Sequence, residues 1–348
     1  MGTTNKKLTL GFIGNGKSAN RYHIPYILRR PERIRLKTIW QRRAGNGPWA
    51  AVPSVEYTTD LDGMLADPEI DAVVVCAPAQ AHYELAAKAL EAGKHCVVEK
   101  PFTETPEQAE ELFRLADRKG LVIEAYQNRR FDSDFLTAQK VIESGKLGDL
   151  LEMELHFDYY RPEVPESQKE FTFNNSFLYG HACHTLDQII SYFGKPERVV
   201  YDVRQLLGKG RMNDYFDLDL FYSDNLKISV KSSYFRVKQR PSFVVYGKRG
   251  CFVKETKDRQ EEHLKLFYLP GQPGFGLDLP EHYGVLTWYD ENGGFHEEKV
   301  PSVPGDYGRY YDALYETILG GGEKLVKDEE TLEQLRIMSE GIRRMNRM

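Results

Sequence analysis

GFIGNGKSAN, at residues 11–20, fits two incompatible motifs for binding phosphate groups. Gly11–Ser18 matches the loop G-x-x-x-x-G-K-[ST] of nucleotide triphosphatases, and Gly14–Ala19 matches the dinucleotide fingerprint G-x-G-x-x-G/A. The apolar pattern of residues 8–13 runs through Gly11 without a break, so Gly11 belongs to a strand rather than to a loop. A triphosphatase also needs a carboxylate that holds Mg²⁺ at the end of a second strand, and DAVVVCAP (71–78) ends without one. The stretch therefore favours a dinucleotide.

The turn after this strand supplies the groups that a dinucleotide requires. Gly14 allows the tight turn, Gly16 lets the backbone approach the pyrophosphate, and Ala19 lets the helix pack closely on the strand. The helix that begins near Ser18 offers N–H groups and a positive dipole to the phosphate oxygens. We therefore expect the cofactor to be bound by Gly14, Asn15, Gly16, Lys17 and Ser18.

The end of the second predicted strand indicates which dinucleotide is bound. NAD-specific enzymes carry Asp or Glu there, which bonds the ribose 2′-hydroxyl, but IRLKTIWQRR (34–43) ends in Gln41, Arg42 and Arg43. A carboxylate would repel the 2′-phosphate of NADP, whereas guanidinium groups bind phosphate through paired, charge-assisted hydrogen bonds. The sequence therefore predicts NADP(H) in preference to NAD(H). The alternative is that both arginines only cover a surface turn.

Short apolar runs alternate with helical patterns through about residue 126. A helix is expected near Ala19–Arg30, and runs such as DAVVVCAP and KHCVVEKP (94–101) lack alternation, as do strands buried on both faces. Helices between such strands make right-handed crossovers. The pattern predicts an α/β fold that begins with an N-terminal Rossmann domain, a doubly wound parallel sheet over residues 1–126.

The rhythm changes after residue 126, where several strand patterns follow one another and YSDNL (222–226) predicts a hairpin. They predict a C-terminal α+β domain over 127–348, with a large, mostly antiparallel open sheet that carries the substrate side. Residues 267–305, rich in Gly and Pro, are expected to form loops and an insertion. Helices are expected near Phe131–Ser144, His181–Phe193, Tyr307–Leu319 and Glu329–Met345, the last two packing back on the body.

Composition and charge exclude several classes of protein. The 348 residues carry a formal net charge of −5, with 41% hydrophobic and 28% charged residues, so nothing directs the chain to nucleic acid or to a membrane. The four cysteines are scattered without a C-x-x-C pair, which is typical of a reducing compartment. We expect a cytoplasmic protein whose partner is a small molecule.

Lys100 is the first candidate for chemistry. VVEKPFT (97–103) ends a predicted strand, so Lys100 would project from the carboxyl edge of the sheet, where open α/β folds bind their ligands. The alternative is an ordinary loop ion pair between Glu99 and Lys100.

The helix over 181–193 carries the second candidate. Its apolar residues line up as one buried stripe and leave His184 and Asp187 on a polar face, of a kind that is usually solvated. His181 and His184 are three residues apart with no convincing third ligand, so no metal is expected.

With these residues the sequence resembles the Gfo/Idh/MocA oxidoreductases, a family that includes glucose–fructose oxidoreductase and inositol dehydrogenases. The resemblance covers nearly the whole chain. It is carried by GFIGNGKSA, by CAPAQAHYELAAKALEAGKHCVVEKPF (76–102), by YQNRRFD (126–132) and by HTLDQIISYFG (184–194). The chain looks especially close to a bacterial branch of largely uncharacterised members with YQNRRFD and HFDYYRP (156–162).

The resemblance implies roles for particular positions. Lys100 would hydrogen-bond the reacting hydroxyl or carbonyl group and steady negative charge on its oxygen. His184 matches the acid/base histidine of the family, and hydride would pass between the substrate carbon and nicotinamide C4. Further residues are expected at the cofactor, and Lys100 is expected there too: Ala77, Pro78, His82, Glu99, Lys100, Asn128 and Arg129. Tyr160 and Arg161 are expected in the substrate pocket.

One position departs from the family pattern. Many members carry Asp four residues before the histidine, one helical turn away, where it can orient the imidazole; this chain has Gly180 there. Asp187 would have to replace that carboxylate from the following turn, or His181 would have to join the site.

The leading hypothesis is an NADP-dependent oxidoreductase, a dehydrogenase or reductase acting on a sugar, inositol or similar polyol or keto-sugar. One alternative is a catalytically silent, cofactor-binding regulator on the same fold, and another is an NAD-dependent, redox-neutral glycoside hydrolase. Retention of Lys100 and His184 favours the enzyme, and the set Gln41-Arg42-Arg43 weighs against the glycosidase. The resemblance also implies a homodimer or homotetramer.

Overall fold

The computed structural model describes residues 6–45 and 47–347, which form two units. The first unit contains the chain as far as Asn128, together with Glu262–Phe275 and Tyr307–Leu332. The second contains Arg129–Glu261, Gly276–Asp306 and the chain from Glu333 onward. This arrangement differs from the continuous division expected at residue 126, because two later segments belong to the first unit.

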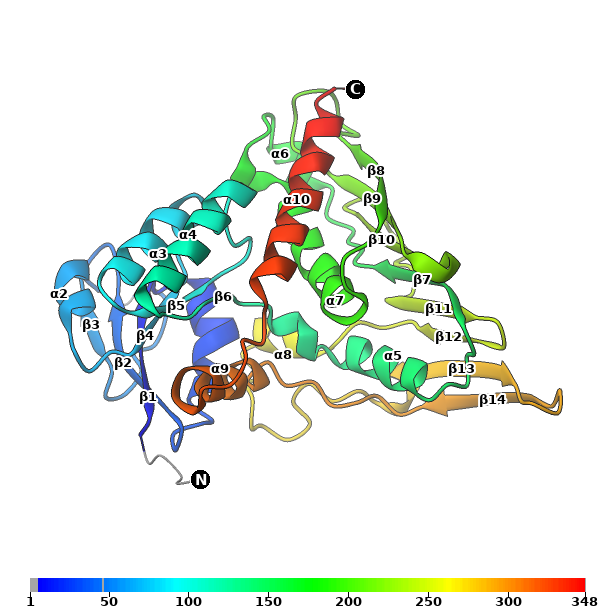
Figure 1. Cartoon of the computed structure of the whole chain (residues 1–348), viewed down its shortest axis with the longest axis horizontal. Helices are drawn as coiled ribbons and strands as arrows, with labels where there is room; N and C mark the ends of the chain where they lie inside the picture. Colours follow the sequence, from blue (N-terminus) through cyan, green and yellow to red (C-terminus); the bar gives the residue numbers. More distant parts are fainter. Residues whose placement is uncertain (1–5, 46, 348) are drawn as a thin grey trace. The chain divides into compact units, whose positions relative to one another are not determined.

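The first unit is built on a parallel sheet of six strands in the order β3-β2-β1-β4-β5-β6 (Figure 1). Its strands are β1 (Leu8–Ile13), β2 (Ile34–Trp40), β3 (Glu56–Thr58), β4 (Ala72–Val75), β5 (His95–Val98) and β6 (Ile123–Ala125). All residues of β1 and β4 are buried, which agrees with their uninterrupted apolar runs. The predicted doubly wound sheet is confirmed. Its strand order reverses between β1 and β4, the position where open α/β sheets bind ligands.

Helices alternate with these strands as predicted. They are α1 (Ile24–Ile27), α2 (Leu61–Ala66), α3 (His82–Glu91), α4 (Pro106–Lys119) and α9 (Arg309–Gly320). α3 and α4 lie side by side (Figure 1). Thr105 begins α4 with a capping box that includes Gln108, and Gly120 ends it in a left-handed conformation.

The helix expected near Ala19–Arg30 is shorter and irregular. A π-helical turn covers Ala19–His23, and α1 ends at Ile27. Pro25 has no N–H to donate to the carbonyl of Arg21, so a regular α-helix loses a hydrogen bond at this point. π-Turns of this kind often accompany functional sites, and this one directly follows the glycine-rich turn.

α9 joins the first unit through two buried tyrosines. The Tyr311 hydroxyl lies 2.5 Å from Nδ1 of His23, and the ring of Tyr310 packs edge-to-face on Tyr126. Burial of these large rings stabilises the attachment of a helix that is distant in the sequence. Periodicity alone does not reveal this attachment, because it identifies a buried stripe without identifying what covers it.

The second unit is built on a sheet of eight strands in the order β14-β13-β12-β11-β7-β10-β9-β8. Its strands are β7 (Leu150–His156), β8 (Arg198–Arg204), β9 (Tyr215–Phe221), β10 (Lys227–Ser233), β11 (Phe243–Gly247), β12 (Gly250–Lys254), β13 (Gly284–Tyr289) and β14 (Phe295–Val300). β7 and β10 are parallel, and all other neighbours are antiparallel. The predicted mostly antiparallel sheet is confirmed, and YSDNL connects the antiparallel pair β9 and β10.

The expectation that 267–305 forms loops and an insertion is incomplete, because the strands β13 and β14 also lie within these residues. The two strands pair across a turn in which Asp290 Oδ1 accepts hydrogen bonds from the N–H groups of Asn292 and Gly294. Every residue of β14 except Val300 is exposed. An exposed, charged edge strand lacks the apolar alternation from which strands are predicted, while its charges discourage pairing with other chains.

The helices of the second unit are α5 (Ser133–Glu143), α6 (Glu163–Ser167) and α7 (Cys183–Phe193), and α8 (Gln260–Lys265) and α10 (Asp328–Met345) contribute residues to both units. A π-helical turn over Leu178–Ala182 precedes α7, so the α-helix begins at Cys183 rather than at His181. Gln334 in α10 donates a hydrogen bond to the carbonyl of Cys183, which fastens α10 to α7. Among the described residues, no helix combines the length and the apolarity that crossing a bilayer demands.

Candidate functional site

A pocket of ≈ 580 Å³ lies in the first unit at the carboxyl ends of β1, β2 and β4. It is lined by Gly14, Asn15, Gly16, Trp40, Gln41, Arg42, Gly45, Gly47, Cys76, Ala77, Pro78, Ala81, Glu84 and Leu85. The pocket therefore stands at the reversal of strand order between β1 and β4. It brings together the predicted glycine turn, the end of β2 and the residues Ala77 and Pro78 after β4.

The glycine turn fits a dinucleotide in two respects. Gly14 has a φ of +122°, and a Cβ added there would lie 2.5 Å from the carbonyl oxygen of Cys76, so only glycine fits. A Cβ at Gly16 would meet nothing within 4 Å, which leaves its backbone open to a phosphate. Asn15 donates a hydrogen bond of 3.0 Å from Nδ2 to Oε1 of Gln41, and this bond fastens the turn to the end of β2. Gly11 lies within β1, as predicted.

We expect Gly14→Ala to weaken binding of the nicotinamide cofactor by about 30-fold or more and to lower the melting temperature. The new methyl group collides with the carbonyl of Cys76, and alanine disfavours a positive φ. The combined cost is about 2 kcal/mol or more, which corresponds to about 30-fold in affinity where the turn itself holds the phosphate. Equilibrium dialysis and thermal melting measure the two effects. Gly16→Ala is the matched control: its melting temperature should stay unchanged, because space surrounds that position.

The predicted basic residues around this pocket differ in position. Arg42 lines the pocket, and Gln41 beside it is buried. Arg43 and Lys17 are exposed and are not among the lining residues. Of Arg42 and Arg43, Arg42 is therefore the one whose guanidinium group can contact a phosphate of a ligand in the pocket.

Ser18 and Glu99 form a buried cluster with His23 instead of lining the pocket. Glu99 accepts hydrogen bonds from the hydroxyl of Ser18 and from Nε2 of His23, the latter at 2.9 Å. Burial acts to raise the pKa of the Glu99 carboxyl, but the hydrogen bond and charge of His23, with smaller effects of Lys100 and Ser18, lower this pKa to about 2. Glu99 also accepts a hydrogen bond of 2.9 Å from the backbone N–H of Lys100. The charged carboxylate therefore holds the start of the loop that carries Lys100.

His82 lies behind the pocket wall. Its Nδ1 is 2.8 Å from the carbonyl oxygen of Pro101, and its Nε2 is 3.0 Å from that of Ala77. The carbonyl of Ala77 belongs to the loop after β4 and that of Pro101 to the loop after β5. The buried ring therefore connects these two loops. His82 thereby positions Ala77, which lines the pocket, and the loop of Lys100.

In the second unit, His184 and Asp187 are buried on α7, which corrects the expectation of a solvated polar face. Both oxygens of Asp187 accept hydrogen bonds from the guanidinium group of Arg130, at 2.7 and 2.8 Å. The amide of Gln188 donates a hydrogen bond of 2.7 Å to the carbonyl of Arg129. α7 is thus fixed to the segment after Asn128, a connection that periodicity could not reveal.

His181 lies among aromatic rings on the π-turn before α7. Its Nδ1 donates a hydrogen bond of 3.2 Å to the carbonyl of Phe177, and its ring meets those of Tyr159 and Tyr234 edge-on. At Gly180 an added Cβ would meet nothing within 4 Å. The structure therefore has room for a side chain at position 180, where many members of the resembled family carry aspartate.

Arg129 is engaged by groups that the sequence did not identify. Its guanidinium pairs with Glu261 and with Asp132, and lies 4.8 Å from the centre of the Phe157 ring. Lys257 donates a hydrogen bond of 2.7 Å to the carbonyl of Asp158 and lies 4.2 Å from the same Phe157 ring. Burial, opposed by Asp158 and aided by Arg129, lowers the pKa of Lys257 to about 8. No motif marks Lys257 or Glu261, because Glu261 meets Arg129, and Lys257 meets the Phe157 ring, only through the fold.

Asn128, Tyr160 and Arg161 are the remaining predicted residues. Asn128 is buried in the first unit. Tyr160 is 57% exposed, and Arg161 is an exposed residue whose guanidinium lies 5.0 Å from the centre of the Tyr159 ring. Their predicted contact with a substrate stays a prediction. Among the described residues, no three His, Cys, Asp or Glu side chains are grouped as metal ligands would be.

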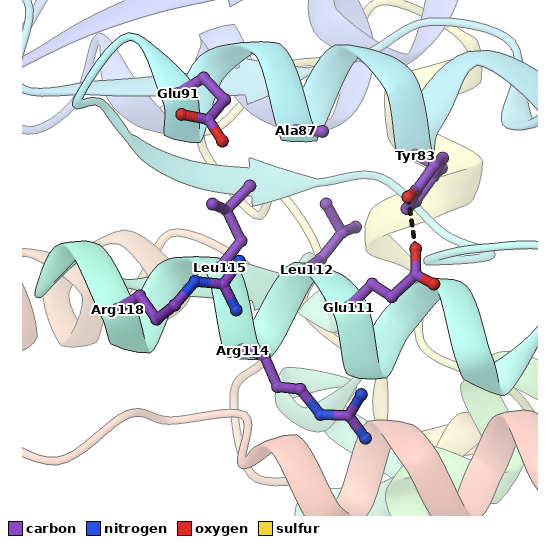
Figure 2. A pocket seen from close by; sticks show the side chains of 8 residues that line it. All are labelled: Tyr83, Ala87, Glu91, Glu111, Leu112, Arg114, Leu115 and Arg118. Atoms are coloured by element: carbon purple, nitrogen blue, oxygen red, sulfur yellow. Dashed lines mark hydrogen bonds between the residues drawn. The ribbon is translucent and has the colours of Figure 1, made fainter.

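A second pocket of ≈ 390 Å³ lies between α3 and α4 (Figure 2). Ala87, Leu112 and Leu115 line it, and the Tyr83 hydroxyl donates a hydrogen bond of 2.5 Å to Glu111 at one end. No predicted site residue lies in this groove. The candidate site for a cofactor is therefore the larger pocket at β1 and β4.

Comparisons with known proteins agree with this geometry. Residues 8–127 match the model of an oxidoreductase family with an NAD-binding Rossmann fold, and residues 139–347 match that family's C-terminal alpha/beta domain. An uncharacterized oxidoreductase of Escherichia coli, YhhX, is 48% identical over 335 residues, which cover 96% of each chain. The scyllo-inositol 2-dehydrogenase (NADP(+)) IolW of Bacillus subtilis is 34% identical over 333 residues, 95% of this chain and 92% of its own. The crystal structure of an oxidoreductase from Bacillus cereus has a TM-score of 0.91 at 45% identity and covers 97% of this chain and 96% of its own.

Proposed function

This chain belongs to the Gfo/Idh/MocA family of oxidoreductases, and we propose that it is an NADP-dependent member that transfers hydride between nicotinamide and a sugar, inositol or similar polyol or keto-sugar. The observation that carries the cofactor is Arg42 on the pocket wall at the end of β2, where an NAD-specific fold has a carboxylate. The substrate class is supported by the name of the Bacillus subtilis relative, a scyllo-inositol dehydrogenase that uses NADP⁺.

In this proposal Lys100 polarises the oxygen of the reacting group. It follows β5 at the carboxyl edge of the sheet, and the loop that carries it is held by Glu99 and His82. An ammonium group that donates a hydrogen bond to the substrate oxygen stabilises the negative charge that develops there, while the same bond is weaker to the neutral ground state.

His184 moves the proton. It accepts the hydroxyl proton when the substrate is oxidised and returns a proton when a carbonyl group is reduced. The bound nicotinamide supplies the acceptor or donor of the hydride. The side chain of His184 is buried on α7 and is therefore shielded from bulk water. The proton on His184 exchanges with the substrate rather than directly with solvent.

We expect Arg42→Ala to weaken NADPH binding by about 10- to 100-fold and to change NADH binding by less than about threefold. Loss of a charge-assisted hydrogen bond to the 2′-phosphate costs about 1.5–3 kcal/mol, and NADH has no such phosphate. Titration of cofactor fluorescence measures both dissociation constants. Arg43→Ala is the matched control and should have a smaller effect, because Arg43 does not line the pocket. Tighter binding of NADH than of NADPH by the unchanged protein would contradict the cofactor proposal.

A substrate screen tests the reaction. Polyols with NADP⁺ and keto-sugars with NADPH should include compounds that change the absorbance of the nicotinamide. Cofactor binding without turnover across the screen would favour the silent regulator. Cleavage of glycosides with no net change in absorbance, dependent on NAD, would favour the redox-neutral hydrolase.

A further inference from the structure

Three side-chain amides and one backbone carbonyl form a chain of hydrogen bonds that ends at the nucleotide pocket. Nδ2 of Asn20 donates to the carbonyl oxygen of Gly16 and to Oδ1 of Asn15, at 2.9 Å in both cases. Nδ2 of Asn15 donates in turn to Oε1 of Gln41, at 3.0 Å. Asn15 and Gln41 line the pocket, whereas Asn20 lies on the π-turn and is not a lining residue. A residue outside the pocket is therefore connected to the residue that follows β2.

The carbonyl of Gly16 fixes the direction of this chain. An amide side chain accepts with its oxygen and donates with its nitrogen, and the two ends have almost the same shape, so either can face a neighbour. A backbone carbonyl only accepts, so the atom of Asn20 that faces Gly16 is its nitrogen. The same nitrogen faces Asn15, which must present its oxygen to it, and Asn15 then presents its nitrogen to the oxygen of Gln41. Each bond thus determines the orientation of the next amide.

The side chain of Gln41 consequently has its nitrogen available for a ligand. Along residues 6–45 and 47–347, the bond from Asn15 is the only hydrogen bond that this side chain makes. Gln41 is 9% exposed and lines the pocket. Its oxygen is occupied by Asn15, and Nε2 offers two N–H groups.

A donor after β2 suits NADP(H) for a chemical reason. NAD-specific folds carry a carboxylate there, which accepts a hydrogen bond from the ribose 2′-hydroxyl. An ionised phosphate only accepts, so it requires N–H or O–H donors, and its hydrogen bonds are charge-assisted. The amide nitrogen of Gln41 is such a donor, and Arg42 beside it lines the same pocket. An oxygen of Gln41 in the same place would repel the phosphate and would suit a hydroxyl group.

We propose that Asn20 and Asn15 determine the selectivity for NADPH over NADH as positioning residues, because they orient the amide of Gln41 as a donor to the 2′-phosphate. The inference rests on the proposed NADP dependence and adds a second group that recognises the phosphate beside Arg42. Asn20 acts through Asn15 and Gln41, since it does not line the pocket itself. Reversal of the chain would give the ligand an oxygen in place of the nitrogen.

Asn20→Asp tests the direction of the chain. Aspartate has nearly the shape of asparagine but only accepts, so it cannot donate to the carbonyl of Gly16, and it accepts from the nitrogen of Asn15. Asn15 then presents its oxygen to Gln41, which turns its own nitrogen toward Asn15 and its oxygen toward the ligand. The ratio of the NADH to the NADPH dissociation constant should fall about tenfold, as expected for the loss of one charge-assisted hydrogen bond. Equilibrium dialysis with each cofactor measures this ratio.

A cycle of variants separates the orientation of Gln41 from the added charge. Gln41→Ala should lower the ratio about tenfold by itself, and Asn20→Asp should lower it little further in that background, because no amide is left to turn. Gln80→Glu is the matched control: it makes the same change of amide to carboxylate on an exposed residue between Pro78 and Ala81, and it should leave the ratio unchanged.

A second variant covers a failure of Asn20→Asp to fold. Asn15→Asp keeps the bond from Asn20 to Gly16, and its carboxylate accepts from both neighbours, so Gln41 again turns its nitrogen away from the ligand. The same cycle with Gln41→Ala should again show no further fall in the ratio.

Failure of the inference and failure of the proposed function are distinguishable. A protein that prefers NADPH and keeps its full preference in Asn20→Asp overturns the role of the chain alone. So does an equal fall of the ratio with and without the Gln41 side chain, which shows an effect of charge, and so does an equal loss of affinity for both cofactors, which shows a general structural role. An unchanged protein that binds NADH more tightly, or that binds no nicotinamide cofactor, overturns the proposed function and the inference with it.

Discussion

Lys100→Ala should lower kcat by about 10²- to 10³-fold with the substrate that the screen identifies. That range is typical for removal of one hydrogen-bond donor to an oxygen that becomes negatively charged in the transition state. Affinity for NADPH should change by less than about threefold, because Lys100 is not among the residues that line the nucleotide pocket. Steady-state kinetics and cofactor titration separate the two effects.

Two variants control this experiment. Lys88→Ala removes an exposed lysine of the same unit, paired with Asp62, and should leave kcat unchanged. Lys100→Arg keeps the positive charge but not the compact ammonium, so it should recover only part of the rate. If kcat of Lys100→Ala equals that of the unchanged protein, Lys100 is not the polarising group and the assigned site is wrong.

Asp187→Ala should destabilise the protein by about 3–5 kcal/mol. The side chains of Arg130 and Asp187 are 9% and 2% exposed and share two hydrogen bonds. Removing the carboxylate leaves a guanidinium group buried without that partner, which costs far more than an exposed ion pair contributes. Denaturant unfolding measures the loss, provided that the transition is treated for two units rather than one.

The double variant Arg130→Met, Asp187→Leu decides what the carboxylate is for. Apolar side chains of similar volume can replace a buried ion pair at little cost, so most of the lost stability should return. If kcat returns as well, Asp187 supports α7 and does not orient His184. If stability returns and kcat stays low, with the pH dependence of kcat shifted, Asp187 belongs to the proton relay as the sequence hypothesis allowed. An Asp187→Ala protein as stable as the original would contradict the structural role.

Much of the first unit could be predicted because its signals are local. The apolar runs of β1 and β4 are buried on both faces, and a parallel strand of this kind is legible in a few consecutive residues. The turn at Gly14 could be predicted for the same reason, since its conformation requires a residue without a Cβ atom. β14 was missed because an exposed edge strand has no apolar pattern, and α1 was overestimated because Pro25 interrupts it.

The family, the doubly wound sheet, the dinucleotide turn and the absence of an acid at the end of β2 can be read from the amino-acid sequence, since each depends on residue types at short spacing. Which of these residues contact one another follows from the folded chain. In the folded protein Arg42 lines the pocket and Arg43 does not. Asp187 accepts a hydrogen bond from Arg130, and Glu99 accepts one from His23. Phe267 contacts Arg21 across more than two hundred positions of chain. Contacts between distant segments depend on which apolar surfaces are buried together and which charged groups are paired in the fold. A pattern of neighbouring residues does not contain this information.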